Sequence, residues 1–365
     1  MNDERKKVLK MIEEGLISSE EAEELLDSLE KAKQADEQAT TLSKQVNWDE
    51  QSNQKQKSTS TGKKASILQF VEEAFHKIKH ADLDFNFGTY FDVSHIFHHD
   101  AAHLKDVDID VSNGNVDIQP WSEQDIRITC KAKVYQVENQ DEARRTFLEG
   151  SELKIDGGVM RFYIPSKQIK TNITIHVPRQ QYAKVSVRLF NGAVDVKELE
   201  IKQLQTQTKN GALNVEKVIG DKLELETTSG SIKVKQAQCQ TLEAETINGS
   251  VKLNGAFEKV DAQTVSGSIH CDWHGNNART AFIKTTTGSI RLTVPQSLEV
   301  DGQLKTNIGS IQCDINNYHV IEEKKEMLQR QLHFTTYNAK EDVLFMEAEA
   351  KTGSIWVRAK EDFDA

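Results

Sequence analysis

The chain has 365 residues, of which 37% are hydrophobic, 28% charged and 7% aromatic, and its net charge at pH 7 is −11. This acidic balance argues against general nucleic-acid binding, which requires basic stripes, and the longest apolar run, Val343–Met346, is far too short to cross a bilayer. The hydrophobic share is low for a globular chain of this length, so we expect either a disordered portion or an unusually thin core.

The start of the chain lacks the basic and then apolar segments, with a small-residue cleavage site, that mark a secretory leader. We therefore expect a cytoplasmic protein, with peripheral membrane association as the open alternative. Four cysteines in so long a chain do not form a disulfide scaffold.

Residues 1–37 carry 12 acidic and 6 basic side chains and have the pattern of a two-helix hairpin. Gly15 ends the first helix, and Ser18 or Ser19 caps the second. A hairpin of this size is too small for a core of its own, so we expect its apolar residues to contact a second copy or a protein partner. The alternative is that it folds back on the rest of the chain. The candidate interface residues are Leu16, Ile17, Leu25, Leu26 and Leu29.

Residues 38–66 are rich in Gln, Ser, Thr and Lys and are predicted to be a flexible linker, because they cannot bury enough apolar area to offset chain entropy. An amphipathic helix is predicted next, from Ile67 to Ile78, and residues 67–105 are expected to cap the N-terminal end of the following region. The alternative for residues 63–80 is contact with a membrane surface, where their lysines would lie near lipid phosphates.

A short motif with a central glycine then repeats with a period near 20 residues, as in Ser229-Gly-Ser-Ile-Lys-Val and Asn248-Gly-Ser-Val-Lys-Leu. The residues before and after each glycine alternate between apolar and polar, which is typical of two short strands with one buried face. The glycine is expected at a turn with positive φ. These turn glycines are Gly114, Gly192, Gly211, Gly230, Gly249, Gly267, Gly288, Gly309 and Gly353.

The fixed period predicts a mainly β chain, a parallel β-solenoid (β-helix) of about 20-residue rungs over residues 67–365. Cys271 and Cys313 occupy equivalent positions with one rung between them, about 9–10 Å apart, too far for a disulfide. Residues 141–150 are predicted to form a short helix. The interval of 44 residues between Gly309 and Gly353 suggests two periods with one motif missing. Residues 316–345 are interpreted as an insertion at the C-terminal end, for which a helix is suggested.

Two clusters are candidate functional sites. His95, His98, His99 and His103 have helical spacing and are the candidate metal ligands, although Asp92 and Asp100 are the only close carboxylates and a loop or cap surface is the favoured interpretation. Glutamates alternate with lysines in the repeat, which suggests either a solvated face or, less favoured, a polysaccharide-active site. That ladder comprises Glu224, Glu226, Glu243, Glu245, Lys233, Lys235 and Lys252.

The Gly-Ser-Ile ladder, the Ile-Thr-Ile-His-Val-Pro segment at 173–178 and the acidic N-terminal hairpin resemble the YvlB- and LiaX-like proteins of Gram-positive bacteria, whose repeat region is an adhesin-like domain of unknown function. The resemblance implies a part in cell-envelope stress, linked to the Lia system and to phage-shock-type membrane proteins. It implies no catalytic residues.

We therefore expect a non-enzymatic interaction or scaffold protein without a cofactor, whose partners are proteins, including a phage-shock-type membrane protein or itself through residues 1–37. Two alternatives stay open. One is a polymerising scaffold whose solenoid ends stack as in bactofilin filaments. The other is a glycan-binding or carbohydrate-active β-helix protein.

Overall fold

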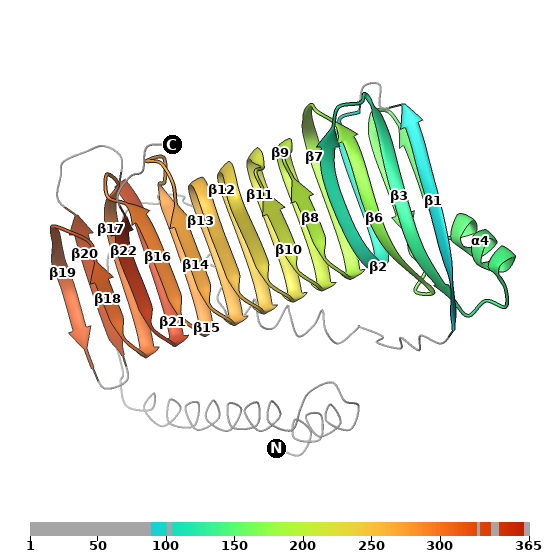
Figure 1. The fold of residues 1–365 in the computed structure, drawn as a ribbon. Coiled ribbons are helices and arrows are strands. Elements are labelled where there is room, and N and C mark those ends of the chain that lie inside the picture. Colours follow the sequence, from blue (N-terminus) through green and yellow to red (C-terminus); the bar gives the residue numbers. More distant parts are fainter. Residues whose placement is uncertain (1–88, 101–103, 327–328, 337–342, 361–365) are drawn as a thin grey trace, which may run out of the picture. The chain divides into compact units, whose positions relative to one another are not determined.

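The computed structural model describes residues 89–100, 104–326, 329–336 and 343–360. These residues form 22 strands and one helix, and all the strands belong to one hydrogen-bonded sheet (Figure 1). The mainly β chain with many parallel strands that the repeat predicts is therefore what the structure shows. The predicted hairpin of residues 1–37, the linker and the helix from Ile67 to Ile78 lie outside the described residues.

The first part of the sheet combines antiparallel and parallel pairs. β3 pairs antiparallel with both β1 and β6, and β6 pairs in parallel with β2, which also pairs with the first strands of the repeat. The described part of the expected cap, residues 90–100, is thus a strand. The elements here are β1 (Tyr90–Asp100), β2 (Asp106–Trp121), β3 (Asp125–Tyr135), α4 (Gln140–Glu149), β4 (Glu152–Asp156), β5 (Val159–Ile164) and β6 (Ile169–Pro178).

The short helix α4 confirms the prediction from its sequence pattern. The side chain of Asn139 accepts a hydrogen bond from the backbone N–H of Glu142, and the helix ends before Gly150. Ala143 and Phe147 are buried and hold the helix against β1 and β3.

The repeat stack begins at β7, and its strands pair in parallel one repeat apart. Leu213 is in register with Val194 and with Ile232, so each neighbour along the stack is displaced by one motif. The strands are β7 (Gln181–Asn191), β8 (Val194–Lys197), β9 (Glu200–Asn210), β10 (Leu213–Glu216), β11 (Ile219–Ser229), β12 (Ile232–Asn248), β13 (Val251–Ser266), β14 (Ile269–Trp273), β15 (Thr280–Thr287), β16 (Ile290–Pro295), β17 (Glu299–Ile308), β18 (Ile311–Asp314), β21 (Val343–Thr352) and β22 (Ile355–Lys360).

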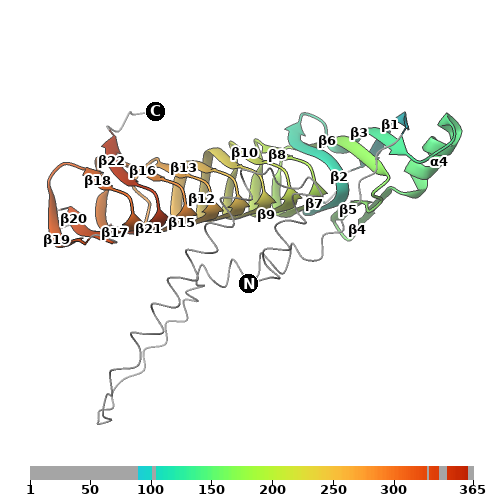
Figure 2. The same ribbon diagram turned by 90° about the horizontal axis from the view of Figure 1, so that it is seen from below.

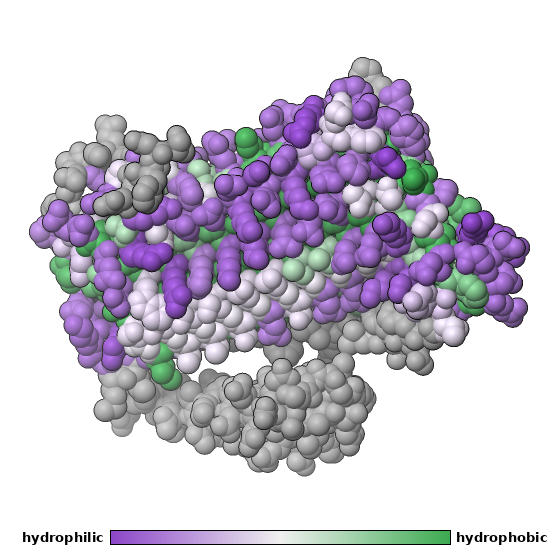
Figure 3. Space-filling view, in the orientation of Figure 1, coloured by the Kyte–Doolittle hydropathy of each residue, from purple (hydrophilic) through white to green (hydrophobic). Residues whose placement is uncertain are grey.

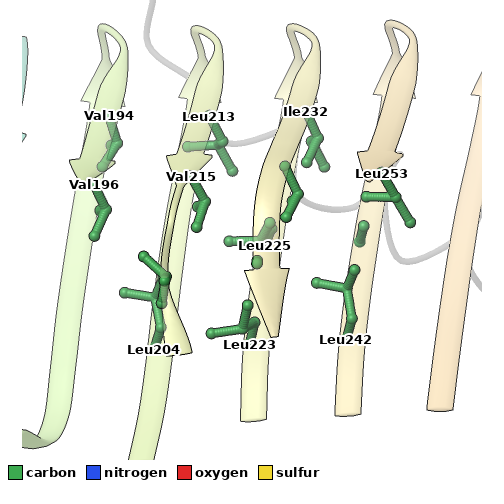
Figure 4. Close-up of a cluster of buried hydrophobic side chains, with 14 of the residues drawn as sticks. Val194, Val196, Leu204, Leu213, Val215, Leu223, Leu225, Ile232, Leu242 and Leu253 are labelled. Atoms are coloured by element: carbon green, nitrogen blue, oxygen red, sulfur yellow. The ribbon is translucent and has the colours of Figure 1, made fainter. Parts of the chain in front are cut away.

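The strands that precede the glycines and those that follow them form two layers, which Figure 2 shows one above the other. The strands before the glycines form the long-strand layer, and the strands after the glycines form the short-strand layer. Side chains that alternate inward from both layers meet between them and make a thin core (Figure 4). Val194, Leu213 and Ile232 come from the short-strand layer, and Leu204 and Leu223 from the long-strand layer, all at most 1% exposed.

The turn glycines lie where the two layers join. Gly230 has φ +159, and a Cβ built there would lie 1.9 Å from the carbonyl oxygen of Gly211 in the preceding rung. Successive turns are therefore packed backbone against backbone, a position that only glycine can occupy.

Three successive rungs also bend six residues after their glycines. The bend falls at Glu198, Lys217 and Gln236, whose φ values of 51° to 54° are left-handed. At Glu198 and Lys217 it separates the short strand from the next long one, and at Gln236 it interrupts the register within β12.

The order of the rungs departs from the order of the sequence at the C-terminal end. β21 lies between β15 and β17, and β22 lies between β16 and β18. Gly353 is consequently next to Gly288, and Gly309 belongs to the last rung. In the 44 residues between Gly309 and Gly353 the chain therefore leaves the last rung and returns to form the rung before it. The interpretation of this interval as two periods with one motif missing was wrong.

The chain makes that excursion as strands and not as the suggested helix. β19 (Tyr318–Lys325) and β20 (Arg330–Thr336) form an antiparallel pair, and β20 also pairs antiparallel with β17. Leu332 and Phe334 are buried and the residues between and beside them are more exposed. This alternation has the period of a strand, which explains the difference.

Candidate functional site

The three described histidines of the candidate metal cluster do not converge. His95, His98 and His99 lie on strand β1, and His103 lies outside the described residues. Because successive side chains of a strand point to opposite faces, His98 is directed away from the side that His95 occupies. The spacing of three and four residues was therefore interpreted with the wrong period.

Each of the three described histidines has a separate neighbour. His98 Nε2 contacts the carboxylate of Asp125, and the ring of His95 packs edge-on against Phe97 with ring centroids 4.4 Å apart. His99 Nδ1 lies 2.8 Å from the carbonyl oxygen of Asp100. Within the part of the chain that the structure describes, no three His, Cys, Asp or Glu side chains are placed to hold a metal ion.

The glutamate and lysine ladder divides between the two layers. Glu224, Glu226, Glu243 and Glu245 point outward from the long-strand layer, whereas Lys233, Lys235 and Lys252 point outward from the short-strand layer. The sequence alternation suggested one mixed face, but the turn at each glycine sends the two sets to opposite sides.

On the glutamate side, Lys222 pairs with two of the carboxylates, since its Nζ contacts Glu224 and lies 3.2 Å from Glu243. Asp261 continues the row one rung further, and burial is the main reason that its pKa is raised, with the charge of Glu243 adding to the effect. An amide hydrogen bond from Gln263 and the charge of Lys284 oppose the shift.

The four cysteines are free thiols. Leu292 and Val357 separate Cys271 from Cys313 along the stack, so the two lie three rungs apart and not two as the sequence order suggested. Burial raises the pKa of all four thiols, which makes them poor nucleophiles at neutral pH.

A groove of about 760 Å³ runs across the short-strand layer over β12, β13, β14, β16, β22 and β18. We call it the cationic groove, because five Lys or Arg side chains and two Asp side chains line it. Its polar lining residues are Lys233, Lys235, Lys252, Asn254, His270, Asp272, Arg291, Thr293, Gln312, Asp314, Trp356 and Arg358. Figure 3 shows that the surface of the stack is largely hydrophilic, with a paler band along it.

The centre of the groove is a single row of side chains one rung apart. Lys233, Lys252, His270 and Arg291 are successive register partners, and Arg291 is followed by Trp356. Neighbouring strands lie about 4.8 Å apart, so the four basic side chains extend over about 14 Å. The guanidinium of Arg291 lies 5.1 Å from the centre of the Trp356 ring.

The two aspartates of the groove are already engaged. Asp272 accepts hydrogen bonds from Lys360 Nζ at 2.5 Å and from Asn254 Nδ2 at 3.1 Å, and Asp314 accepts from Gln312. Arg358 donates to the hydroxyl of Thr293 at 3.1 Å. Within the described residues, no carboxylate forms an ion pair with Lys233, Lys252 or Arg291.

The row is electrostatically unfavourable to a further positive charge. Burial lowers the pKa of His270, and the positive charges of Arg291 and Lys252 lower it further. His270 is therefore held neutral at pH 7 and can donate or accept a hydrogen bond.

Sequence reasoning found only part of this groove. The lysines were assigned to a mixed ladder, whereas His270 and Arg291 were missed, although they occupy the same position three residues after the turn glycine. Aligning the repeats by that position would have found them. Trp356 could not have been placed beside Arg291 by alignment, because the rung order is not the sequence order.

Residues 104–342 match the Toastrack DUF4097 family, and residues 3–34 match a SHOCT-like domain. Over 358 residues the chain is 40% identical to the uncharacterised protein YvlB of Bacillus subtilis strain 168, covering 97% of this chain and 98% of YvlB. The resemblance expected from the Gly-Ser-Ile ladder is confirmed.

Solved structures of two candidate adhesins are similar at low identity. One, from Bacteroides fragilis NCTC 9343, has a TM-score of 0.42 and 11% identity and covers 73% of this chain and 97% of that one. The other, from Parabacteroides merdae ATCC 43184, has a TM-score of 0.37 and 12% identity and covers 73% and 95%. The helical residues that the structure describes include no segment long and apolar enough to cross a bilayer.

Proposed function

We propose that this chain, which belongs to the Toastrack DUF4097 family and is a homologue of YvlB, is a non-enzymatic interaction scaffold of the cell-envelope stress response that acts through protein contacts near the membrane. The proposal combines a stacked surface, built by strands β7 to β18, β21 and β22, with an N-terminal module that recruits a partner or a second copy.

The observation that carries the proposal is the regularity of the repeat stack. Its interior is filled by side chains such as Leu223, Leu242 and Ile283, each fully buried. Its exterior consists of rows of side chains at intervals of about 4.8 Å. Stacked repeats of this kind offer long, stiff surfaces on which a partner can be held at many points.

The SHOCT-like match at residues 3–34 supports the second half of the proposal, since it coincides with the apolar hairpin pattern. The residues we assign to the contact are Leu16, Ile17, Leu25, Leu26 and Leu29.

Crosslinking with mass spectrometry, in cells with and without an envelope-active antibiotic, tests the proposal. We expect stress to increase crosslinks between the full chain and a membrane protein, and the double substitution Leu25→Glu and Leu26→Glu to abolish them. Lys31→Gln with Lys33→Gln is the control that changes charge without touching the apolar residues. Identical crosslinks in stressed and unstressed cells would contradict the assignment to envelope stress.

A further inference from the structure

The cationic groove contains a row of like charges that, unlike the glutamate row with its Lys222, has no ion-pair partner among the described residues. Like charges directly opposite each other on neighbouring strands destabilise a sheet. Several other lysines of the described stack have a carboxylate on an adjacent strand: Lys197 has Asp117, Lys284 has Glu347 and Lys305 has Glu349. In the groove, Lys233, Lys252 and Arg291 stand in one row with only the neutral His270 between them. A chain with net charge −11 thus collects unneutralised positive charge on one surface.

The strands that carry the row from Lys233 to Trp356 leave no backbone group for a ligand. β13, β14, β16 and β22 each have a parallel partner on both sides, so their N–H and C=O groups take part in the ladder. A peptide cannot be added here as a further strand, because that mode requires a free edge. Recognition must come from side chains, which offer cationic groups in a line and one indole ring.

Anions suit these groups for specific reasons. Lysine and arginine form short, charge-assisted hydrogen bonds with phosphate and carboxylate oxygens. The neutral His270 can donate from one ring nitrogen and gains a proton more easily once an anion lies beside it. Lys252 and Arg291 are exposed and Lys233 is half-buried. Because the three spread over about 14 Å, a ligand with a single charge cannot reach all of them.

We propose that the cationic groove binds a linear polyanion whose negative charges lie on a polyol or sugar backbone, with Lys233, Lys252, His270 and Arg291 as the anion contacts. Trp356, at the end of the row, supplies a flat face for one ring or for the carbon chain of the polymer. Single-stranded nucleic acids fit less well, because they need an aromatic side chain for successive bases and this groove has one. The inference goes beyond the protein contacts proposed above and does not depend on them.

Isothermal titration of the full chain with defined polymers tests the inference. Poly(glycerol phosphate) and polygalacturonate are polyanions whose charges are phosphates and carboxylates, respectively. Dextran is the neutral polymer. Oligo(dT) represents single-stranded nucleic acids, and poly-glutamate represents acidic polypeptides. We expect saturable binding of at least one of the first two, weaker at high salt because counterions are released on binding. Dextran should give no heat of binding.

The matched variants have the same net charge. The groove variant carries Lys233→Gln, Lys252→Gln and Arg291→Gln, and the control carries Lys184→Gln, Lys202→Gln and Lys259→Gln at exposed positions outside the groove. We expect the groove variant to bind at least about tenfold more weakly and with a shallower salt dependence, and the control to bind as the natural chain does. Equal thermal unfolding curves show that both variants fold.

A separate measurement addresses His270 and Trp356. Affinity should rise between pH 7.5 and pH 5.5 in the natural chain, and His270→Gln should remove most of that rise. Trp356→Phe should keep more affinity than Trp356→Ala. Equal weakening by the control variant would overturn the groove as the site, and tighter binding of oligo(dT) or poly-glutamate would overturn the class of ligand, as would failure of both anionic polymers to bind.

Discussion

The hydroxyl of Thr306 donates a hydrogen bond to the carbonyl oxygen of Gly353 at 2.8 Å, although Gly353 lies 47 residues later in the chain. In the regular rungs the equivalent threonine donates to a glycine that precedes it, as Thr246 donates to Gly230 at 3.0 Å over 16 residues. Thr306 donates to a later residue because β21 and β22 lie between strands that precede them in the sequence: β21 lies between β15 and β17, and β22 between β16 and β18.

This hydrogen bond accounts for a polar residue in the core. Threonine stands three residues before most turn glycines, and it is buried, as Thr246 and Thr285 are. A buried hydroxyl without a partner lowers stability, but here it meets the glycine carbonyl of the neighbouring rung. The column of threonines therefore links rung to rung at the turn.

Removing one of these hydroxyls should be costly. We expect Thr246→Val to lower the free energy of unfolding by about 1–3 kcal/mol, because the Gly230 carbonyl loses its donor in a buried place. Thr206 is the matched control, since its buried hydroxyl has no hydrogen-bond partner among the described residues. Thr206→Val should leave the urea midpoint unchanged or raise it, and equal losses for both would contradict the role given to the hydrogen bond.

The turn glycines provide a second test. In Gly230→Ala the new methyl group would lie 1.9 Å from the Gly211 carbonyl oxygen, and the backbone at φ +159 would also be strained. We expect a loss of more than about 3 kcal/mol, measured by urea unfolding. Gly157 has φ +58 but open space around it, so Gly157→Ala should cost only about 1 kcal/mol. A small effect at Gly230 would show that neighbouring turns can move apart.

The rungs could be predicted from the sequence because each rung is specified by a local pattern of residues. Alternation around Gly230 sets which side chains, such as Ile232 and Leu225, enter the core, and the required turn explains the glycine. The order of the rungs could not be obtained in this way, because each long strand presents the same register to any neighbour. Phe345 is thus equally suited to the partner Thr280, which precedes β21 in the stack, and to Asp301, which follows it.

Predicting the candidate site requires both the repeat pattern and the order of the rungs. Lys233 and Lys252 follow from the repeat, but the contact between Arg291 and Trp356 exists only because β22 lies beside β16. For the histidines of β1, the sequence pattern leaves the type of secondary structure open. A run such as His95 to His99 fits helical and extended spacing alike, and the antiparallel pairing with all of β3 decides for the strand.

The buried thiols predict a loss of stability in alkali. Burial raises the pKa of Cys130 and of Cys239 to about 12 and that of Cys313 to about 11, from the 9.0 of a free thiol. The unfolded chain therefore releases these protons at lower pH than the folded chain does. Stability should be unaffected by the thiols below about pH 9 and should fall as the pH rises from there toward 12.

Urea midpoints measured from pH 7 to pH 10.5 check this sign. The double variant Cys130→Ala and Cys239→Ala should show a flatter decline above pH 9 than the natural chain. A thiol reagent added to the folded protein should modify Cys313 first, since it is less buried than the other three cysteines. Rapid labelling of Cys130 at pH 8 would contradict the burial described for it.

The rung of Gly353 offers a change that should stabilise the protein. It has Ala350 where the neighbouring rungs have Thr285 and Thr306, and these three residues are register partners. By analogy with the other rungs, a threonine at position 350 would donate to the carbonyl of Gly288, which lies next to Gly353. The same side chain already fits at both neighbouring positions, so we expect Ala350→Thr to raise the free energy of unfolding by about 1 kcal/mol. Ala348→Thr, at a buried position where no glycine carbonyl is presented, is the control and should destabilise the chain. A midpoint for Ala350→Thr below that of the natural chain would contradict the hydrogen bond expected at the Gly288 carbonyl.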